Sequence, residues 1–228
     1  MEILLLKAIV FRSPYVAYNV NQYSAVEVLS QAWYSPYMIA QSLIKKLKNQ
    51  IEKQDSGRAG IIRETGSLVR EAKHAIFKLH RGEIKEAEKA LAEVGRKLKH
   101  MVNVAEKAGL RGEATLGAAV EEFLEASYLL RVMQKKSLSV VTGFKTRAEE
   151  ELSALSDLTG ELVRAATLEV TRGERKAIKQ YRDATEELFG VLLSMNLRGA
   201  LRQKRDDARR NLKRLEEILY DVSLTKTH

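Results

Sequence analysis

The stretch 113-EATLGAAVEEFLEASYLLRVMQKK-136 decides the fold class of this chain. Its apolar residues recur at helical spacing and it contains no proline, so the pattern predicts a helix over 113–136. The same character extends outward from this stretch, because no proline occurs between Met38 and His228 and Ala, Leu, Glu, Lys and Arg are abundant there. We therefore predict an all-α fold.

Glycines mark where these helices are expected to end. The connections at glycine are short, so neighbouring helices should run antiparallel. These connections are expected at Gly82, Gly109–Gly112, Gly143 and Gly173. The resulting prediction is seven helices, over 38–54, 60–81, 83–107, 113–136, 144–172, 174–195 and 198–223.

Residues 1–37 differ from the rest of the chain. They hold both prolines and half of the aromatic residues but very few charges. One interpretation is a genuine N-terminal segment that packs its aromatic side chains; the other is sequence upstream of a true start at Met38. We therefore divide the chain into an atypical N-terminal segment, 1–37, and a helical domain, 38–228.

Composition narrows the function classes. The chain has 228 residues, of which 45% are hydrophobic and 30% charged, a composition typical of a soluble globular protein. Its formal net charge of +9 favours an anionic partner such as nucleic acid. It has no cysteine, which excludes disulfides, thiolate zinc sites and cysteine nucleophiles and fits a reducing, cytoplasmic location. No stretch approaches the ~20 apolar residues of a membrane span, so no membrane partner is expected.

Four carboxylates lie where apolar residues would be expected. Glu122 and Glu125 are three residues apart and flanked by small and apolar residues, and Asp157 and Glu161 share a face of the predicted helix 144–172. Burying a lone carboxylate costs several kcal/mol, so such acids need partners. Oxygen ligands on two helices suit Mg²⁺ or Mn²⁺, which can activate water and neutralise a phosphate. The alternative is that these acids pair with lysines or arginines of other helices.

A di-iron bundle is a weaker interpretation of the same acids. Such a bundle needs a Glu-x-x-His pair on each of two helices, and only Glu71 with His74 has that spacing. Iron chemistry is therefore not expected.

Two basic segments could bind a nucleic-acid backbone. The first is 70–81 and the second is 202-RQKRDDARRNLKR-214. The alternative is a solvated helix face whose basic residues pair with neighbouring acids. Aromatic residues are sparse after residue 37, so base stacking should not be the main binding mode. The residues expected to hold the backbone are Arg70, Lys73, His80, Arg81, Arg202, Lys204 and Arg205.

Four segments of the chain occur together in one known family. They are REAKHAIFKLHR (70–81), EEFLEA (121–126), SDLTGELVRAAT (156–167) and RRNLKRLEEILYDVSL (209–224). Together these segments resemble the translin superfamily. The resemblance runs from about Met38 to Leu224 and does not cover 1–37. It implies a seven-helix translin-like bundle that assembles around nucleic acid into a hollow homo-oligomer, an octamer or a smaller dimer-built form.

The superfamily has two branches, and the four acids bear on which one this chain resembles. Translin itself is mainly a binding protein, whereas the translin-associated factor X branch carries a metal-dependent endoribonuclease site. The acids of that branch's Q-E-Y-V-E-A-like and D-L-T-G-E-L motifs match the same four positions, Glu122, Glu125, Asp157 and Glu161. Glu121 replaces the Gln of the first motif, which leaves open whether it joins the metal site.

The resemblance is therefore closest to the translin-associated factor X branch. The absence of cysteine and the Lys- and Glu-rich composition favour an archaeal single-gene version. The family's basic L-R-K-R segment matches 201–204, with Gln203 in place of one basic residue. The expected function is a Mg²⁺- or Mn²⁺-dependent endoribonuclease acting on single-stranded RNA, with single-stranded DNA or short duplex RNA as other partners. The alternatives are a non-catalytic oligomer that binds single-stranded RNA or DNA, as translin does, and a purely structural helical protein.

Overall fold

A computed structural model describes residues 40–140 and 143–224 of the chain. The segment 1–37 lies outside the described residues, so both interpretations of it stay predictions. The chain divides into two compact units, residues 1–53 and 54–228.

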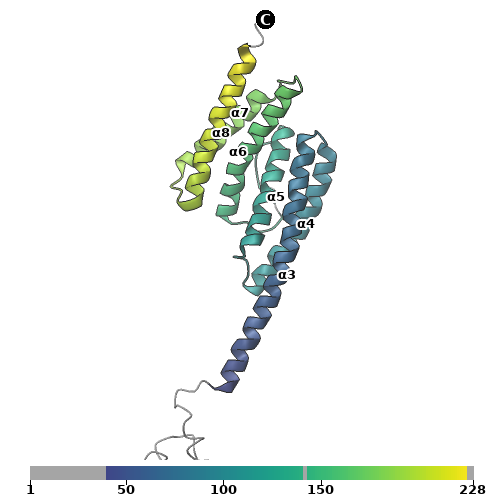
Figure 1. Ribbon diagram of the computed structural model, residues 1–228, viewed down its shortest axis with the longest axis vertical. Coiled ribbons are helices and arrows are strands. Elements are labelled where there is room, and N and C mark those ends of the chain that lie inside the picture. Colours follow the sequence, from purple (N-terminus) through teal and green to yellow (C-terminus); the bar gives the residue numbers. More distant parts are fainter. Residues whose placement is uncertain (1–39, 141–142, 225–228) are drawn as a thin grey trace, which may run out of the picture. The chain divides into compact units, whose positions relative to one another are not determined.

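The described residues form six helices and no strand, which confirms the all-α prediction (Figure 1). None of these helices is both long enough and apolar enough to span a bilayer. In chain order they are α3 (Gln41–His80), α4 (Ile84–Ala108), α5 (Ala114–Met133), α6 (Ala148–Thr171), α7 (Ile178–Ser194) and α8 (Gly199–Leu224).

The predicted break between 54 and 60 is wrong. A single helix, α3, covers both of the first two predicted helices. The intervening residues, Asp-Ser-Gly-Arg-Ala, contain one glycine and no proline. One glycine costs a helix only about 1 kcal/mol relative to alanine, which the rest of a long helix offsets. By contrast, Gly82 and Gly109 do end helices, with φ of 80° and 70° in the left-handed region.

The connection between α5 and α6 is longer than predicted. Helix α5 ends at Met133 rather than at 136, and α6 begins at Ala148 rather than at 144. Lys135 takes the left-handed conformation that usually calls for glycine, with φ of 56°. The Lys136 amide then donates to the Arg131 carbonyl oxygen at 2.8 Å and closes the helix end. A helix end at a lysine cannot be predicted from the sequence pattern, because glycine is the residue that usually indicates it.

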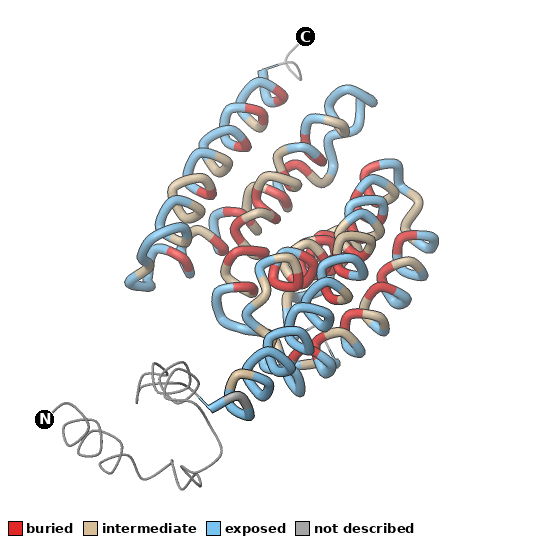
Figure 2. Tube along the Cα trace, turned by 60° about the horizontal axis from the view of Figure 1, so that its bottom comes forward, coloured by how far each residue is buried: buried red, intermediate tan, exposed pale blue. Residues whose placement is uncertain are grey.

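Helix α6 is the centre of the packing. It contacts α5, α7 and α8, while α4 packs on the other side of α5. Their facing sides are buried along each helix (Figure 2). Leu124 and Leu129 of α5 and Leu158 and Leu162 of α6 have no exposed surface. Gly95 lets α4 approach α5 closely, because a Cβ there would lie 2.9 Å from the Phe123 ring.

A buried ion pair fixes the start of α6. The Glu150 carboxylate has no exposed surface and accepts hydrogen bonds of 2.7 and 2.6 Å from both terminal nitrogens of Arg111. The Arg147 backbone amide and Nε also donate to it, each at 2.9 Å. Arg111 belongs to the connection before α5, so this cluster sets α6 against α5. The four candidate acids lie on those two helices.

Candidate functional site

Helices α5 and α6 bring the four predicted acids together. Glu122 and Glu125 lie on α5, Asp157 and Glu161 lie on α6, and the two helices pack against each other. All four side chains are partly buried, as the surrounding small and apolar residues predict. The charges of the other three acids each contribute to the electrostatics of Glu125, which places the four carboxylates in one cluster. We call these four residues the acid cluster.

Glu125 is the acid without a hydrogen-bonded or ion-paired partner, although the charge of Lys204 partly offsets the rise in its pKa. Its carboxylate has no hydrogen bond or ion pair within residues 40–140 and 143–224. Burial raises its pKa to about 8, and the negative charges of Glu122, Asp157 and Glu161 add to the rise. Glu125 therefore holds a proton near neutral pH until a cation offers it a counter-charge.

The other three acids have basic partners from distant parts of the sequence. The Lys73 Nζ lies 3.6 Å from Oε2 of Glu122. Lys204 of α8 donates a hydrogen bond to Asp157. Burial nevertheless raises the pKa of Glu122, because it outweighs the effect of Lys73. Pairing with lysines or arginines of other helices, the alternative weighed from the sequence, thus holds for Glu122 and Asp157. Glu161 pairs instead with His80 and with Arg164 of its own helix, and Glu125 has no such partner.

His80 contacts the acid cluster and is not part of an exposed basic face. Its side chain is only 3% exposed, and its Nε2 is hydrogen-bonded to Oε2 of Glu161. A buried ring does not fit the predicted contact to an RNA backbone. Helical spacing in the sequence indicates this burial. His80 continues the row of Ala72 and Ile76 at four-residue spacing, and both of those residues are buried.

Glu121 lies apart from the acid cluster. Its Oε2 accepts a hydrogen bond of 2.6 Å from the Ser153 hydroxyl. The Glu121 carboxylate thus has a neutral partner, unlike the three paired acids of the cluster. Glu121 is therefore a natural control for substitutions of Glu125 on the same helix.

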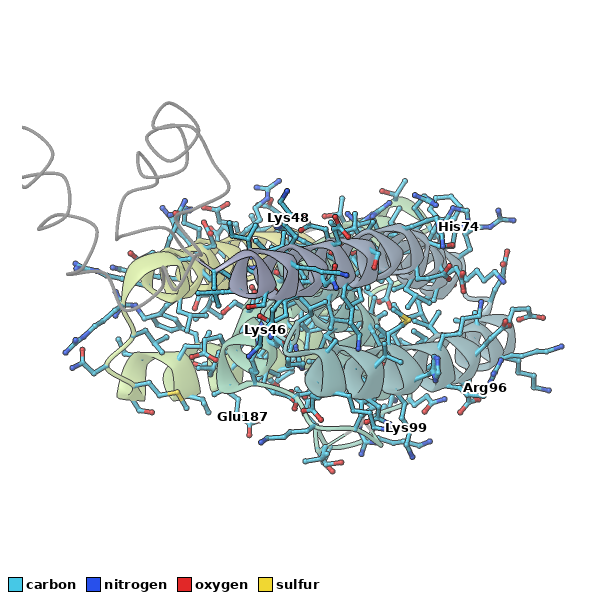
Figure 3. The ribbon with its side chains drawn as sticks, turned by 90° about the horizontal axis from the view of Figure 1, so that it is seen from below. Lys46, Lys48, His74, Arg96, Lys99 and Glu187 are labelled. Carbon is cyan, nitrogen blue, oxygen red and sulfur yellow. The ribbon has the colours of Figure 1, made fainter. Side chains whose placement is uncertain are left out.

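The remaining basic residues stay at the surface. Arg70 lines an open groove of about 340 Å³ between α3 and α4, together with His74 and Lys78. Figure 3 shows His74 on α3 and Arg96 on α4 among the outward-pointing side chains of these helices. Among the other predicted contacts, Arg81 pairs with Glu83 and Arg205 pairs with Asp206. Arg202 is exposed. Lys73, His80 and Lys204 are thus the three predicted contacts that reach the acids.

The acid cluster fits a hard divalent cation by its donor chemistry. Its ligands are carboxylate oxygens, and one of them, from Glu125, is partly buried and unpartnered. Among the described residues no group of three or more His, Asp or Glu side chains is already arranged to hold a metal ion. Lys73, Lys204 and His80 occupy the other three acids, so these partners would have to move aside for a cation to contact all four carboxylates.

The raised pKa of Glu125 predicts a pH-dependent stability difference. A free glutamate has a pKa of about 4.3, so between that value and about 8 the folded chain holds an extra proton and loses stability as pH rises. Glu125→Gln removes this penalty. In EDTA at pH 8.5 its melting temperature should exceed that of the wild type by about 3–6 °C, and the gap should close near pH 5. Thermal melts followed by circular dichroism check this; a gap independent of pH would contradict it.

Comparison with known proteins decides the family. The model of the Translin family matches residues 56–226, which contain the whole acid cluster and both basic segments. This chain belongs to the Translin family. The match begins at residue 56, later than the start near Met38 that the resemblance implied. No curated protein sequence is significantly similar to the chain.

Solved structures of this translin-type fold are similar over their whole length. The chain is 20% identical to the crystal structure of apo-NeC3PO, with a TM-score of 0.72, covering 80% of this chain and 97% of that one. It is 17% identical to AfC3PO, with a TM-score of 0.75, covering 81% and 99% of the two chains. A structure of AfC3PO in complex with duplex RNA gives 17% identity, a TM-score of 0.73 and coverages of 81% and 98%. These likenesses establish the translin fold.

Proposed function

We propose that this translin-family protein is a metal-dependent endoribonuclease that cleaves single-stranded RNA, like the translin-associated factor X branch. The observation that carries the proposal is the state of Glu125, an unpartnered carboxylate inside a cluster of four acids. Keeping a carboxylate in such a place destabilises a protein, so a role in binding a cation explains it better than a structural role. A bound Mg²⁺ or Mn²⁺ supplies a Lewis acid that activates water and offsets charge on the phosphate.

In this proposal different residues of the chain bind the cation and the RNA backbone. Glu122, Glu125, Asp157 and Glu161 would hold the cation. Lys73 and Lys204 each pair with one of these acids. Their ammonium groups therefore lie beside the acids, where they would contact a phosphate of the substrate. The exposed Arg70, Arg81 and Arg202 would grip the backbone farther out. Because such contacts read phosphate and not bases, sequence preference should be weak.

The proposal also includes RNA binding and oligomeric assembly. The similar AfC3PO has been solved with duplex RNA, and the net charge of +9 favours a polyanionic partner. We expect single-stranded RNA to be the preferred ligand, with single-stranded DNA or short duplex RNA also bound. One chain carries all four acids, so a homo-oligomer is the expected assembly, an octamer or a smaller dimer-built form.

A non-catalytic RNA-binding oligomer of the translin type is the second candidate. It is favoured by the basic partners that three of the four acids already have. In that reading Lys73, His80 and Lys204 hold the acids permanently, and the cluster only ties α3 and α8 to α5 and α6. Glu125 then has no function, which is the weakness of this candidate.

Cleavage of a labelled single-stranded RNA by the purified wild-type protein separates the two candidates. Incubations contain Mn²⁺, Mg²⁺ or EDTA, and products are resolved on a denaturing gel. The nuclease proposal predicts internal cleavage with metal and intact RNA in EDTA. RNA that is bound, with an affinity that falls as salt rises, yet stays intact in both metals would favour the binding protein.

A further inference from the structure

Two aromatic side chains are exposed among the described residues, and one of them lies next to the acid cluster. They are Phe77 on α3, 54% exposed, and Tyr220 on α8, 64% exposed. A single exposed apolar side chain is ordinary and needs no explanation by itself. Phe77 differs from Tyr220 in what surrounds it.

Phe77 lies in a row with two cations. Lys73 and Phe77 lie four residues apart on α3, and Arg81 follows the last residue of that helix. The Arg81 amide still donates a hydrogen bond to the Phe77 carbonyl oxygen, so the three residues succeed each other at four-residue spacing along one side. The Arg81 guanidinium carbon lies 5.8 Å from the centre of the Phe77 ring. Lys73 and Arg81 are themselves more than half exposed. Solvent therefore reaches a phenyl ring that stands between two positive charges.

The row leads directly into the acid cluster. Lys73, at one end, lies 3.6 Å from Glu122. His80, which precedes Arg81 at the other end, is hydrogen-bonded to Glu161. An RNA strand following the row would therefore have its phosphates on Lys73 and Arg81 while the acids of α5 and α6 lie beside it.

We infer that Phe77 is a nucleobase-stacking residue that positions one nucleotide of a single-stranded RNA beside the acid cluster. The inference rests on the proposed function and adds to it the contact that sets where the strand lies. Proteins that bind single strands combine cations for the backbone with aromatic rings for the bases. Every base has a stacking face, so the contact needs no sequence preference. It also needs an unpaired base, which gives a physical reason for preferring single strands over a duplex.

RNA affinity measured without metal tests the inference apart from cleavage. Fluorescein-labelled single-stranded RNA is titrated with each protein in EDTA, and anisotropy gives the dissociation constant. Phe77→Ala should weaken binding about tenfold or more. Phe77→Trp should bind at least as well as the wild type, whereas Phe77→Leu should be as weak as Phe77→Ala because it has no ring. Tyr220→Ala is the matched control and should bind like the wild type.

A second ligand, which lacks bases, tests whether the contact of Phe77 is made with a base. An oligomer of the same length with abasic sugars should bind the wild type and Phe77→Ala equally, because only the phosphate contacts remain. Equal affinity of Phe77→Leu and wild type for normal RNA would overturn the inference, because an apolar contact would suffice. So would a change in oligomer size of Phe77→Ala in light scattering, since a second copy of the chain would then cover the ring. A wild type that binds no RNA would overturn the proposed function together with it.

Discussion

Glu125→Gln is expected to lower the rate of metal-dependent RNA cleavage about a hundredfold or more while leaving RNA affinity nearly unchanged. Glutamine keeps the size of the side chain but removes the charge that a cation would need, in a place where burial and three neighbouring acids already raise the pKa to about 8. Phosphate contacts come from Lys73, Lys204 and the exposed arginines, and these stay in place. Initial rates in saturating Mn²⁺ and dissociation constants in EDTA measure the two quantities.

Glu121→Gln is the control for that substitution. It makes the same chemical change one turn earlier on α5, where the carboxylate accepts a hydrogen bond from Ser153. Its cleavage rate should stay within about twofold of the wild type. Equal losses in both variants would show that any lost charge on α5 has this effect, and the assignment of Glu125 would be wrong.

Glu150→Ala is expected to destabilise the fold by about 3–5 kcal/mol. The carboxylate is fully buried and takes two hydrogen bonds from Arg111, whose side chain is only 16% exposed. Its removal leaves a largely buried guanidinium without its counter-charge and frees the first turn of α6, which the Arg147 contacts also hold. Urea unfolding followed by circular dichroism gives the loss in free energy of unfolding.

The neighbouring Glu149 and the pH dependence check the cause of that loss. Glu149 is exposed, so Glu149→Ala should change stability by less than about 0.5 kcal/mol. Burial alone would raise the pKa of Glu150, but hydrogen bonds from Arg111 and the Arg147 backbone outweigh it and lower the pKa. Its stabilisation is thus present above the ordinary glutamate pKa of about 4.3 and lost as pH falls below that value. A loss in Glu150→Ala that is the same at pH 7 and pH 3 would contradict this account.

The sequence predicts the positions of the acids better than their partners. Spacing on one helix puts Glu122 beside Glu125 and Asp157 beside Glu161, because helical periodicity relates residues three and four apart. The contacts of Lys73 and Lys204 join helices separated by many residues. Periodicity carries no information about such contacts, so the basic residues that hold the acids were predicted only as possible RNA contacts.

Local patterns also explain where the helix boundaries differ. Helix α3 stays continuous through Gly57, Gly60 and Gly66, so a glycine by itself does not end a helix that has no proline nearby. Lys135 ends α5 in a conformation that glycine usually adopts. His80 was grouped with the exposed cations because of its charge type, although its helical row with Ala72 and Ile76 indicates burial. Packing decides the outcome for His80, whereas the two helix boundaries follow from how the backbone tolerates glycine and lysine at those positions.

Binding of Mn²⁺ to the RNA-free protein tests the central claim, that the acid cluster is a metal site, most directly. Electron paramagnetic resonance counts free Mn²⁺ during titrations of the wild type, Glu125→Gln and Glu121→Gln at pH 8. We predict saturable binding to the wild type and to Glu121→Gln, with affinity at least about tenfold lower in Glu125→Gln. Equal Mn²⁺ affinity in the wild type and Glu125→Gln, or no binding to either, would contradict the claim and leave the acid cluster as a structural contact.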